Sequence, residues 1–182
     1  LDEIGFSDKS HPMIKGMLRY LESGSCFDTA HEPWLNTVPG NNDYPCAIWW
    51  AYNGESDFRY NPTAALAGFI LKFAEKDSGI YQKALIIAKQ AAEWFDANVP
   101  FNEMHVTNCF VRLYECLCIT GAEVCCMESF KEKLITQVNN SICRDGICLL
   151  FCVVRLCFLC GKSRDGAHCN DDKRKCQTHC LF

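Results

Sequence analysis

Residues 78–98 read SGIYQKALIIAKQAAEWFDAN and carry the clearest helical pattern in the chain. Apolar side chains recur every three or four positions along this stretch, which is the spacing of one face of an α-helix. Ser78 suits the N-cap position because its hydroxyl can accept a hydrogen bond from a free backbone N–H in the first turn. The stretch therefore predicts a long helix with a wide apolar face.

Four more segments show helical periodicity together with start or stop signals. They are residues 13–23, 64–76, 104–120 and 127–142. The predicted N-caps are Ser10, Asn61 and Asn102, and the predicted stops are Gly24 and Gly121. No segment is a convincing strand, so the predicted fold class is all-α. The short connections predict antiparallel helical hairpins.

Composition bounds the class of protein and its partners. The chain has 182 residues, 49% of them hydrophobic, and a net charge of -4, which is typical of a soluble domain and argues against a nucleic-acid partner. The longest apolar run, residues 147–160, is shorter than the roughly twenty residues that span a bilayer. Residues 1–10 lack the basic and apolar regions of a secretory signal, so we expect a cytoplasmic protein without a membrane span.

The cysteines divide the chain into two parts, because eight of the fifteen lie between residues 143 and 182. We expect residues 1–142 to be a helical domain and residues 143–182 to be an aberrant or disordered tail. A frameshift near residues 143–146 would explain why helical periodicity ends where cysteine becomes frequent. This hypothesis predicts an intact continuation in another frame of the underlying DNA.

The tail also has the spacing of a zinc site. Cys157 and Cys160 are followed, fifteen residues later, by Cys176 and His179, which matches a tetrahedral zinc-binding pattern. Such spacing also arises by chance in a segment this rich in cysteine, so the sequence favours no cofactor and zinc stays an alternative. Disulfides are a second alternative for the tail. We expect the seven earlier cysteines to be small hydrophobic core residues.

Residues 27–60 have the composition of a binding site. Eight of the 22 aromatic residues lie here, namely Phe27, Trp34, Tyr44, Trp49, Trp50, Tyr52, Phe58 and Tyr60. Aromatic faces can stack on sugar rings or stabilise a cation by about 0.5 to 2 kcal/mol each. The predicted ligand-binding residues are Trp34, Asn41, Asn42, Tyr44, Trp49 and Trp50.

Asp43 is the candidate catalytic residue, since a carboxylate among aromatic side chains can act as a general acid or base. The turn-forming string NNDYP could hold it at the mouth of a cavity. The alternatives are that Asp43 forms an Asx-turn and that Trp49 and Trp50 are core anchors. Asp28 and His31 form a weaker candidate pair of acid and orienting residue.

Two parts of the chain resemble known proteins. Residues 11–34, HPMIKGMLRYLESGSCFDTAHEPW, resemble one repeat of the prenyltransferase and squalene-cyclase type of α/α toroid. PWLNTVPGNNDYPCAIWWAYN (33–53) and RYNPTAALAGFILKFA (59–74) are similar to bacterial proteins related to that superfamily and generally left without an assigned function. The resemblance covers about residues 10–140 and implies an incomplete toroid-like array whose chain would continue through more helices, a pattern from which this sequence departs after Arg144.

The catalytic motifs of that superfamily are missing. The DxDD acid motif of class II terpene cyclases does not occur, and the zinc ligands of protein prenyltransferases cannot be matched to positions here. We therefore expect a toroid-like protein, either intact or as part of a truncated enzyme, with a cavity loop for an isoprenoid or glycan. The alternatives are a helical scaffold that binds a protein partner and a zinc-binding module in the tail.

Overall fold

The structure is a computed structural model, and it describes residues 7–54 and 60–141. All of these residues belong to the first of the two units into which the chain divides, Leu1–Cys143. The predicted zinc ligands Cys157, Cys160, Cys176 and His179 and the apolar run at 147–160 lie outside the described residues. The predictions for residues 143–182 are therefore not tested by the structure.

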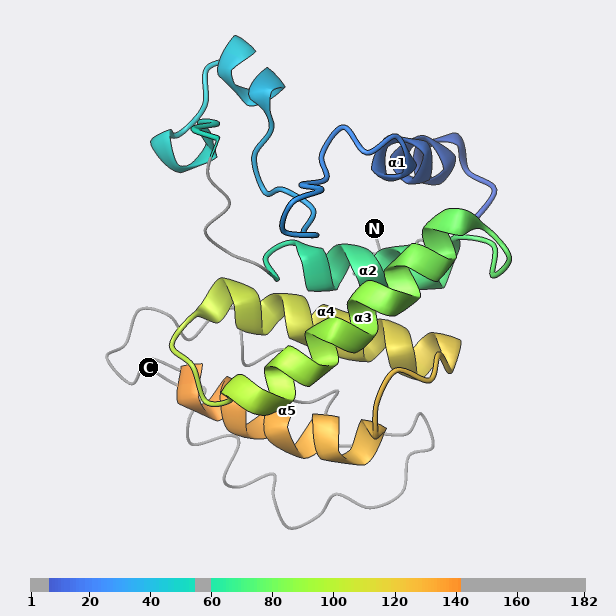
Figure 1. The fold of residues 1–182 in the computed structure, drawn as a ribbon, viewed down its shortest axis with the longest axis vertical. Coiled ribbons are helices and arrows are strands. Elements are labelled where there is room, and N and C mark those ends of the chain that lie inside the picture. The colour runs from blue at the N-terminus through green and yellow to red at the C-terminus, as the bar shows by residue number, and fades with distance from the viewer. Residues whose placement is uncertain (1–6, 55–59, 142–182) are drawn as a thin grey trace, which may run out of the picture. The chain divides into compact units, whose positions relative to one another are not determined.

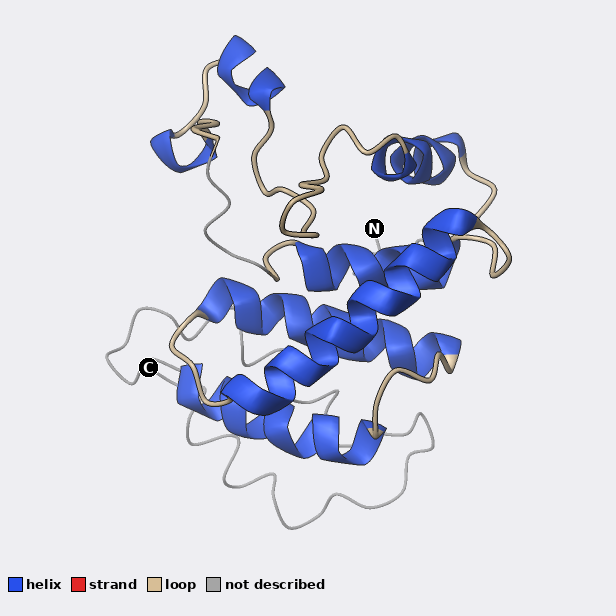
Figure 2. Ribbon diagram, viewed as in Figure 1, coloured by secondary structure: helices blue, strands red, loops and turns tan. Residues whose placement is uncertain are grey.

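The described residues form helices joined by loops (Figure 2). The elements are α1 (Pro12–Glu22), the short 3-10 helices η2 (Pro39–Asp43) and η3 (Ile48–Trp50), α2 (Thr63–Phe73), α3 (Gly79–Asn98), α4 (Met104–Thr120) and α5 (Met127–Ser141). The only β-type pairing among the described residues is an isolated bridge between Phe27 and Trp34, so the all-α class is confirmed there. Not one of the described helices combines the length and the apolar character needed to cross a bilayer.

Two of the predicted boundary signals are confirmed. The Ser78 hydroxyl accepts a hydrogen bond from the backbone N–H of Tyr81 at 3.3 Å, at the start of α3. Gly121 follows α4 with a φ of 66°, a left-handed conformation that glycine adopts without a Cβ clash. The bounds of α3 and α4 match those predicted from the sequence.

The other three predicted N-caps are wrong by one residue each. His11 rather than Ser10 precedes α1, Pro62 rather than Asn61 precedes α2, and Glu103 rather than Asn102 precedes α4. At α1 the His11 ring accepts from Met13 N, and at α4 the Glu103 carboxylate accepts from His105 N. Residue preference alone misplaced these caps, because His11 and Glu103 lie outside the usual capping set and Pro62 makes no side-chain capping hydrogen bond.

The helices pack as back-and-forth pairs (Figure 1). α2 and α4 lie side by side and run in the same direction, while α3 runs back across them and α5 runs back along α4. A methyl group at Gly68 in α2 would lie 3.1 Å from Cys116 Cβ and 3.2 Å from Leu113 Cα in α4. The small residues of α2 therefore permit the close approach predicted for this helix. Closure into a toroid stays a prediction.

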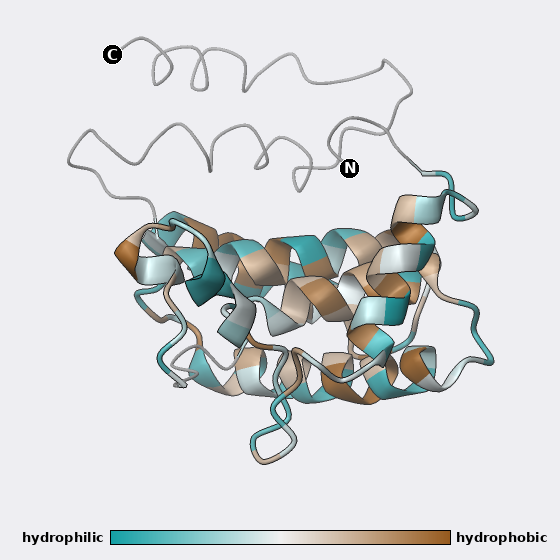
Figure 3. Ribbon diagram, turned by 90° about the horizontal axis from the view of Figure 1, so that it is seen from above, coloured by the Kyte–Doolittle hydropathy of each residue, from teal (hydrophilic) through white to brown (hydrophobic). Residues whose placement is uncertain are grey.

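An aromatic cluster joins three of the helices. The ring centroid of Phe95 in α3 lies 4.5 Å from that of Phe110 in α4 and 5.1 Å from that of Phe130 in α5. All three side chains are buried, and the Phe95–Phe130 pair is edge to face, a favourable geometry for aromatic rings. Figure 3 shows hydrophobic and hydrophilic residues alternating along the helices, as expected when one face of each is buried.

A buried amide fixes the loop between α3 and α4. Gln137 in α5 is fully buried. Its Oε1 accepts from Phe101 N at 2.9 Å, and its Nε2 donates to Phe101 O at 2.7 Å. Nε2 also lies 3.0 Å from Thr107 Oγ1 and 2.9 Å from Ser141 Oγ. Gln137 thus pairs polar groups that would otherwise lose hydrogen bonds on burial.

Candidate functional site

Residues 39–52, which we call the aromatic loop, contain most of the site residues predicted from the sequence. The loop holds η2 and η3, and Figure 1 shows it standing clear of the helices. Pro39 occupies the first turn of η2, where its fixed φ suits a helical start and no N–H is needed. The loop is thus made of two short helical turns joined by an extended link.

Hydrogen bonds from two asparagine side chains fix the shape of the aromatic loop. Asn42 Nδ2 donates to Tyr52 O at 3.0 Å, and Tyr52 N donates to Asn42 Oδ1 at 2.8 Å. Asn41 Nδ2 donates to Trp50 O at 2.9 Å. The two amides, both predicted to bind a ligand, therefore bind the backbone of the loop itself and hold η2 against the residues around η3.

The aromatic loop exposes large apolar side chains to solvent. Tyr44 is 75% exposed, Trp49 73% and Trp50 50%, and the aliphatic Ile48 is 86% exposed. The alternative that Trp49 and Trp50 are core anchors is therefore wrong in this structure. A single exposed apolar side chain is common on protein surfaces. Several of them together form an apolar patch, and such patches mark binding surfaces.

Asp43 lies at the end of η2, between the clamping Asn42 and the exposed Tyr44. Its side chain is exposed. An Asx-turn at Asp43 would need the backbone N–H two residues on, and that residue is Pro45, which has none. The Asx-turn alternative is therefore wrong, and a catalytic role for Asp43 stays a prediction.

Trp34 lies apart from the exposed aromatic side chains. It is 1% exposed and packs edge to face on Phe27, with ring centroids 5.4 Å apart. Its backbone N donates to Thr63 Oγ1 at 2.9 Å, and the same hydroxyl donates to Trp34 O at 3.2 Å. Lys83 Nζ of α3 lies 3.2 Å from the Phe27 ring centroid. Trp34 thus anchors the preceding loop to α2 and α3 as a core residue.

The structure brings Asp28 and His31 together. His31 Nδ1 lies 2.8 Å from Asp28 Oδ2, and Ala30 N donates to Asp28 Oδ1 at 2.8 Å. These hydrogen bonds, first from His31 and then from Ala30, lower the pKa of the Asp28 carboxyl because they favour its charged form. The His31 side chain is 77% exposed. The pair closes a surface turn, and its proposed acid and orienting roles stay predictions.

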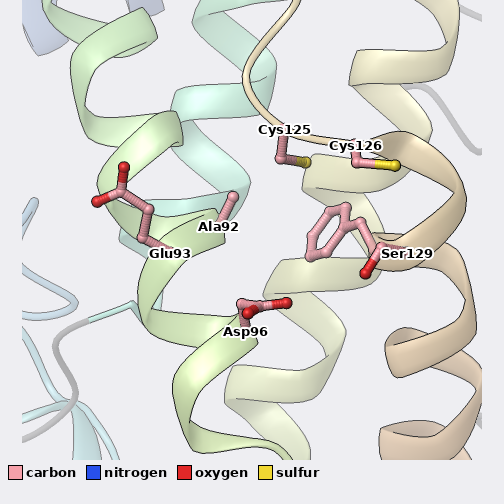
Figure 4. Close-up of a pocket in the computed structure, with 7 residues that line it drawn as sticks. Ala92, Glu93, Asp96, Cys125, Cys126 and Ser129 are labelled. Carbon is pink, nitrogen blue, oxygen red and sulfur yellow. The ribbon is translucent and has the colours of Figure 1, made fainter.

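A groove between α3 and α5 contains two adjacent cysteines (Figure 4). It has a volume of about 350 Å³. The residues that line it are Ala92, Glu93, Asp96, Cys125, Cys126, Ser129 and Phe130. No motif singled out in the sequence lies at this groove. The available signal was the pair of adjacent cysteines in the short link after α4.

The prediction that the seven earlier cysteines are core residues is right for three of them and wrong for four. Cys26, Cys109 and Cys116 are buried, whereas Cys46, Cys118, Cys125 and Cys126 are exposed. The exposed ones lie in loops or at the carboxyl end of α4, where little of the helical core covers them. Burial raises the pKa of the Cys109 thiol to about 11.

Comparison with other proteins adds no identification. No protein-family model, curated protein or solved structure matches the chain. The resemblance to toroid-related bacterial proteins therefore stays a prediction. Within residues 7–54 and 60–141, no three His, Cys, Asp or Glu side chains are grouped so that they could hold a metal ion.

Proposed function

We propose that the aromatic loop binds a glycan, with Tyr44, Trp49 and Trp50 stacking on the apolar faces of sugar rings. One observation carries the proposal: these three aromatic side chains are at least half exposed on a single short segment. Flat aromatic faces offer a large contact area with few rotatable bonds. In the unbound protein this apolar surface is exposed to water, which is unfavourable. A ligand that covers the surface would remove that free-energy cost.

The rigidity of the loop supports a binding role. The paired hydrogen bonds between Asn42 and Tyr52, together with the bond from Asn41 to Trp50 O, fix the backbone that carries the indoles. A backbone that is already ordered loses less conformational entropy when a ligand binds, so more of the contact energy contributes to affinity. On this proposal the asparagines position the aromatic side chains rather than contact the ligand.

The open shape of the loop favours a glycan over an isoprenoid. A fully apolar ligand gains most when a concave pocket encloses it and removes its surface from water. A sugar ring has one apolar face and a polar rim, so it can stack on an exposed indole while its hydroxyls stay hydrated. The Asp43 carboxylate, beside Tyr44 in the sequence, can accept hydrogen bonds from such hydroxyls.

The proposal concerns binding rather than hydrolysis. Glycoside hydrolysis generally uses two carboxyl groups on opposite sides of the scissile bond. Asp43 is the acidic residue among residues 39–52, so we assign it a hydrogen-bonding role in recognition. Activity on a bound glycan would require a second carboxyl group from elsewhere in the protein.

Affinity electrophoresis through gels that contain soluble polysaccharides tests the proposal. We expect at least one polysaccharide of a chemically varied panel to retard the protein. Trp49→Ala should weaken that retardation by about ten-fold, the change expected for a contact worth about 1.4 kcal/mol. The matched control is Ile86→Ala, which removes an exposed apolar side chain of α3 outside the loop. Migration unaffected by every polysaccharide would contradict the proposal.

A protein partner is the second candidate, and Ile48 is the observation that favours it. Ile48 is 86% exposed in the aromatic loop, and an aliphatic side chain has no flat face for a sugar but fits an apolar pocket on a protein. Affinity electrophoresis separates the two functions. A polysaccharide should retard the protein if the loop is a glycan site, and Ile48→Ser should keep that retardation, whereas a protein-binding loop should show no retardation by any polysaccharide.

A further inference from the structure

Cys125 and Cys126 place two thiols at one end of the groove between α3 and α5. Both side chains are exposed, and both line the groove. Consecutive Cα atoms are about 3.8 Å apart, so two adjacent cysteines can both reach one atom between them. Figure 4 shows the Cys125 sulfur extending toward Cys126 and the Cys126 sulfur extending away from Cys125. Rotation of the exposed Cys126 side chain to another staggered rotamer would bring both sulfurs to one atom, so the pair can act as a two-point ligand.

The remainder of the groove combines an apolar floor with a negative edge. Ala92 and Phe130 line the groove but are only 4% and 5% exposed, so each contributes a small apolar area to its floor. Glu93 and Asp96 supply carboxylates, and Lys133 of α5 forms an ion pair with Asp96. The carboxylates disfavour an anionic ligand by charge repulsion. The groove thus suits a neutral compound with an apolar group.

We propose that Cys125 and Cys126 form a capture site for trivalent arsenicals, with the organic substituent on arsenic lying in the groove against Ala92 and Phe130. An arsenoxide R–As=O reacts with both thiols. Two As–S bonds form, the As=O double bond and two S–H bonds break, and the oxygen leaves as water with the two thiol protons. The arsenic stays trivalent and the sulfurs are not oxidised, so no oxidant or reductant is needed.

Two observations favour a trivalent arsenical over a divalent metal ion. The described residues hold no group of three or more metal-binding side chains, whereas an organic arsenical is satisfied by two sulfurs. Desolvation, followed by the nearby Cys126 and Asp96, raises the pKa of the Cys125 thiol. Metal ions bind thiolates and must displace those protons, while the arsenoxide reaction carries them away in water.

Site-resolved protection from alkylation tests the site in the full chain. The reduced protein is incubated with increasing phenylarsine oxide and then alkylated briefly with iodoacetamide. Tryptic cleavage after Arg112 and Lys131 gives a peptide that contains Cys116, Cys118 and the adjacent pair. Fragment-ion spectra of that peptide report each thiol separately, so other cysteines of the chain do not obscure the result.

Phenylarsine oxide should protect Cys125 and Cys126 together, and it should leave the exposed single thiol of Cys118 open to alkylation. In Cys125→Ser the concentration needed to protect Cys126 should rise by about a hundred-fold, because the second contact is then lost. Cys118→Ser is the matched control and should keep the wild-type protection. Because these thiols are exposed, a helical circular dichroism spectrum should be retained in each variant.

Two outcomes would overturn the proposal. Alkylation of Cys125 and Cys126 that is unchanged by phenylarsine oxide in the wild-type protein would show that the pair does not chelate. Protection of Cys126 that persists in Cys125→Ser would show that its partner is another thiol. The wild-type measurement decides the first point even if a variant fails to fold.

Discussion

Asn42 and Tyr52 form a two-point hydrogen-bonded pair across ten positions of the chain, with Nδ2 donating to Tyr52 O at 3.0 Å and Tyr52 N donating to Oδ1 at 2.8 Å. The Asn42 side-chain amide donates and accepts one hydrogen bond each, as a backbone peptide group does when it pairs two β-strands. This pair closes the aromatic loop and fixes the segment that presents Trp49 and Trp50. The proposed glycan site depends on that closure.

Asn42→Ala should loosen the aromatic loop without unfolding the helices. Each lost hydrogen bond contributes about 0.5 to 1.5 kcal/mol to the order of the loop, and loops open separately from the core. Chymotrypsin should cleave after Trp49 and Trp50 faster than in the wild type, with unchanged helical circular dichroism. The control is Asn139→Ala, an exposed position of α5. Equal cleavage rates in all three proteins would contradict the proposed clamp.

Gly68→Ala and Gly16→Ala should have opposite effects on stability. At Gly68 the added methyl would lie 3.1 Å from Cys116 Cβ and 3.2 Å from Leu113 Cα, so α2 must move away from α4, at a cost of about 1 to 3 kcal/mol. Gly16 in α1 has open space around its Cβ position, so alanine should stabilise by about 0.5 to 1 kcal/mol. Urea denaturation measures both, and a neutral or stabilising Gly68→Ala would disprove the close helix contact.

Gln137→Leu should destabilise the protein by about 1 to 3 kcal/mol, because Phe101 N loses its acceptor and Phe101 O keeps only the longer hydrogen bond from Asn140 Nδ2 at 3.2 Å. Leucine fills a similar volume, so the loss reports the hydrogen bonds rather than a cavity. Asn139→Leu, two positions further along α5 and exposed, should change the free energy of unfolding by no more than about 0.5 kcal/mol. Similar urea midpoints for the two variants would show that the amide network contributes little.

The Cys109 thiol should make stability fall at alkaline pH. Burial raises its pKa from 9.0 to about 11, so the unfolded chain loses this proton at a lower pH than the folded protein. The free energy of unfolding is therefore unaffected by this thiol below pH 9. It falls by on the order of 2 kcal/mol as the pH rises toward 11. Urea titrations across this range should show a smaller decline in Cys109→Ala than in the wild type. The same decline in both would contradict the raised pKa.

The long helices could be predicted from the sequence because periodicity and capping agree there. The bounds of α3 and α4 depend on local signals such as Ser78 and Gly121, which the structure confirms. The predicted caps at Ser10, Asn61 and Asn102 were each one residue early, because where the backbone enters a helix also depends on tertiary packing. An acceptor from His11 or Glu103 is outside the usual capping preferences.

The candidate site was predictable as a segment but not residue by residue. Composition placed Trp34 with Trp49 in one aromatic region, yet the structure buries the first and exposes the second. That difference arises from contacts distant in sequence, such as the one between Trp34 and the Thr63 hydroxyl. The roles of Asn41 and Asn42 as backbone clamps depend equally on three-dimensional pairing.

The glycan site on the aromatic loop is tested by intrinsic tryptophan fluorescence with acrylamide quenching, measured with and without the glycan that retards the protein most. The double variant Trp49→Phe/Trp50→Phe retains Trp34 and Trp94 as an internal control. A glycan bound to the aromatic loop should shield the wild-type indoles from acrylamide, and the double variant should show no such shielding. Quenching that no glycan changes, or shielding that persists in the double variant, would contradict a glycan site on the aromatic loop.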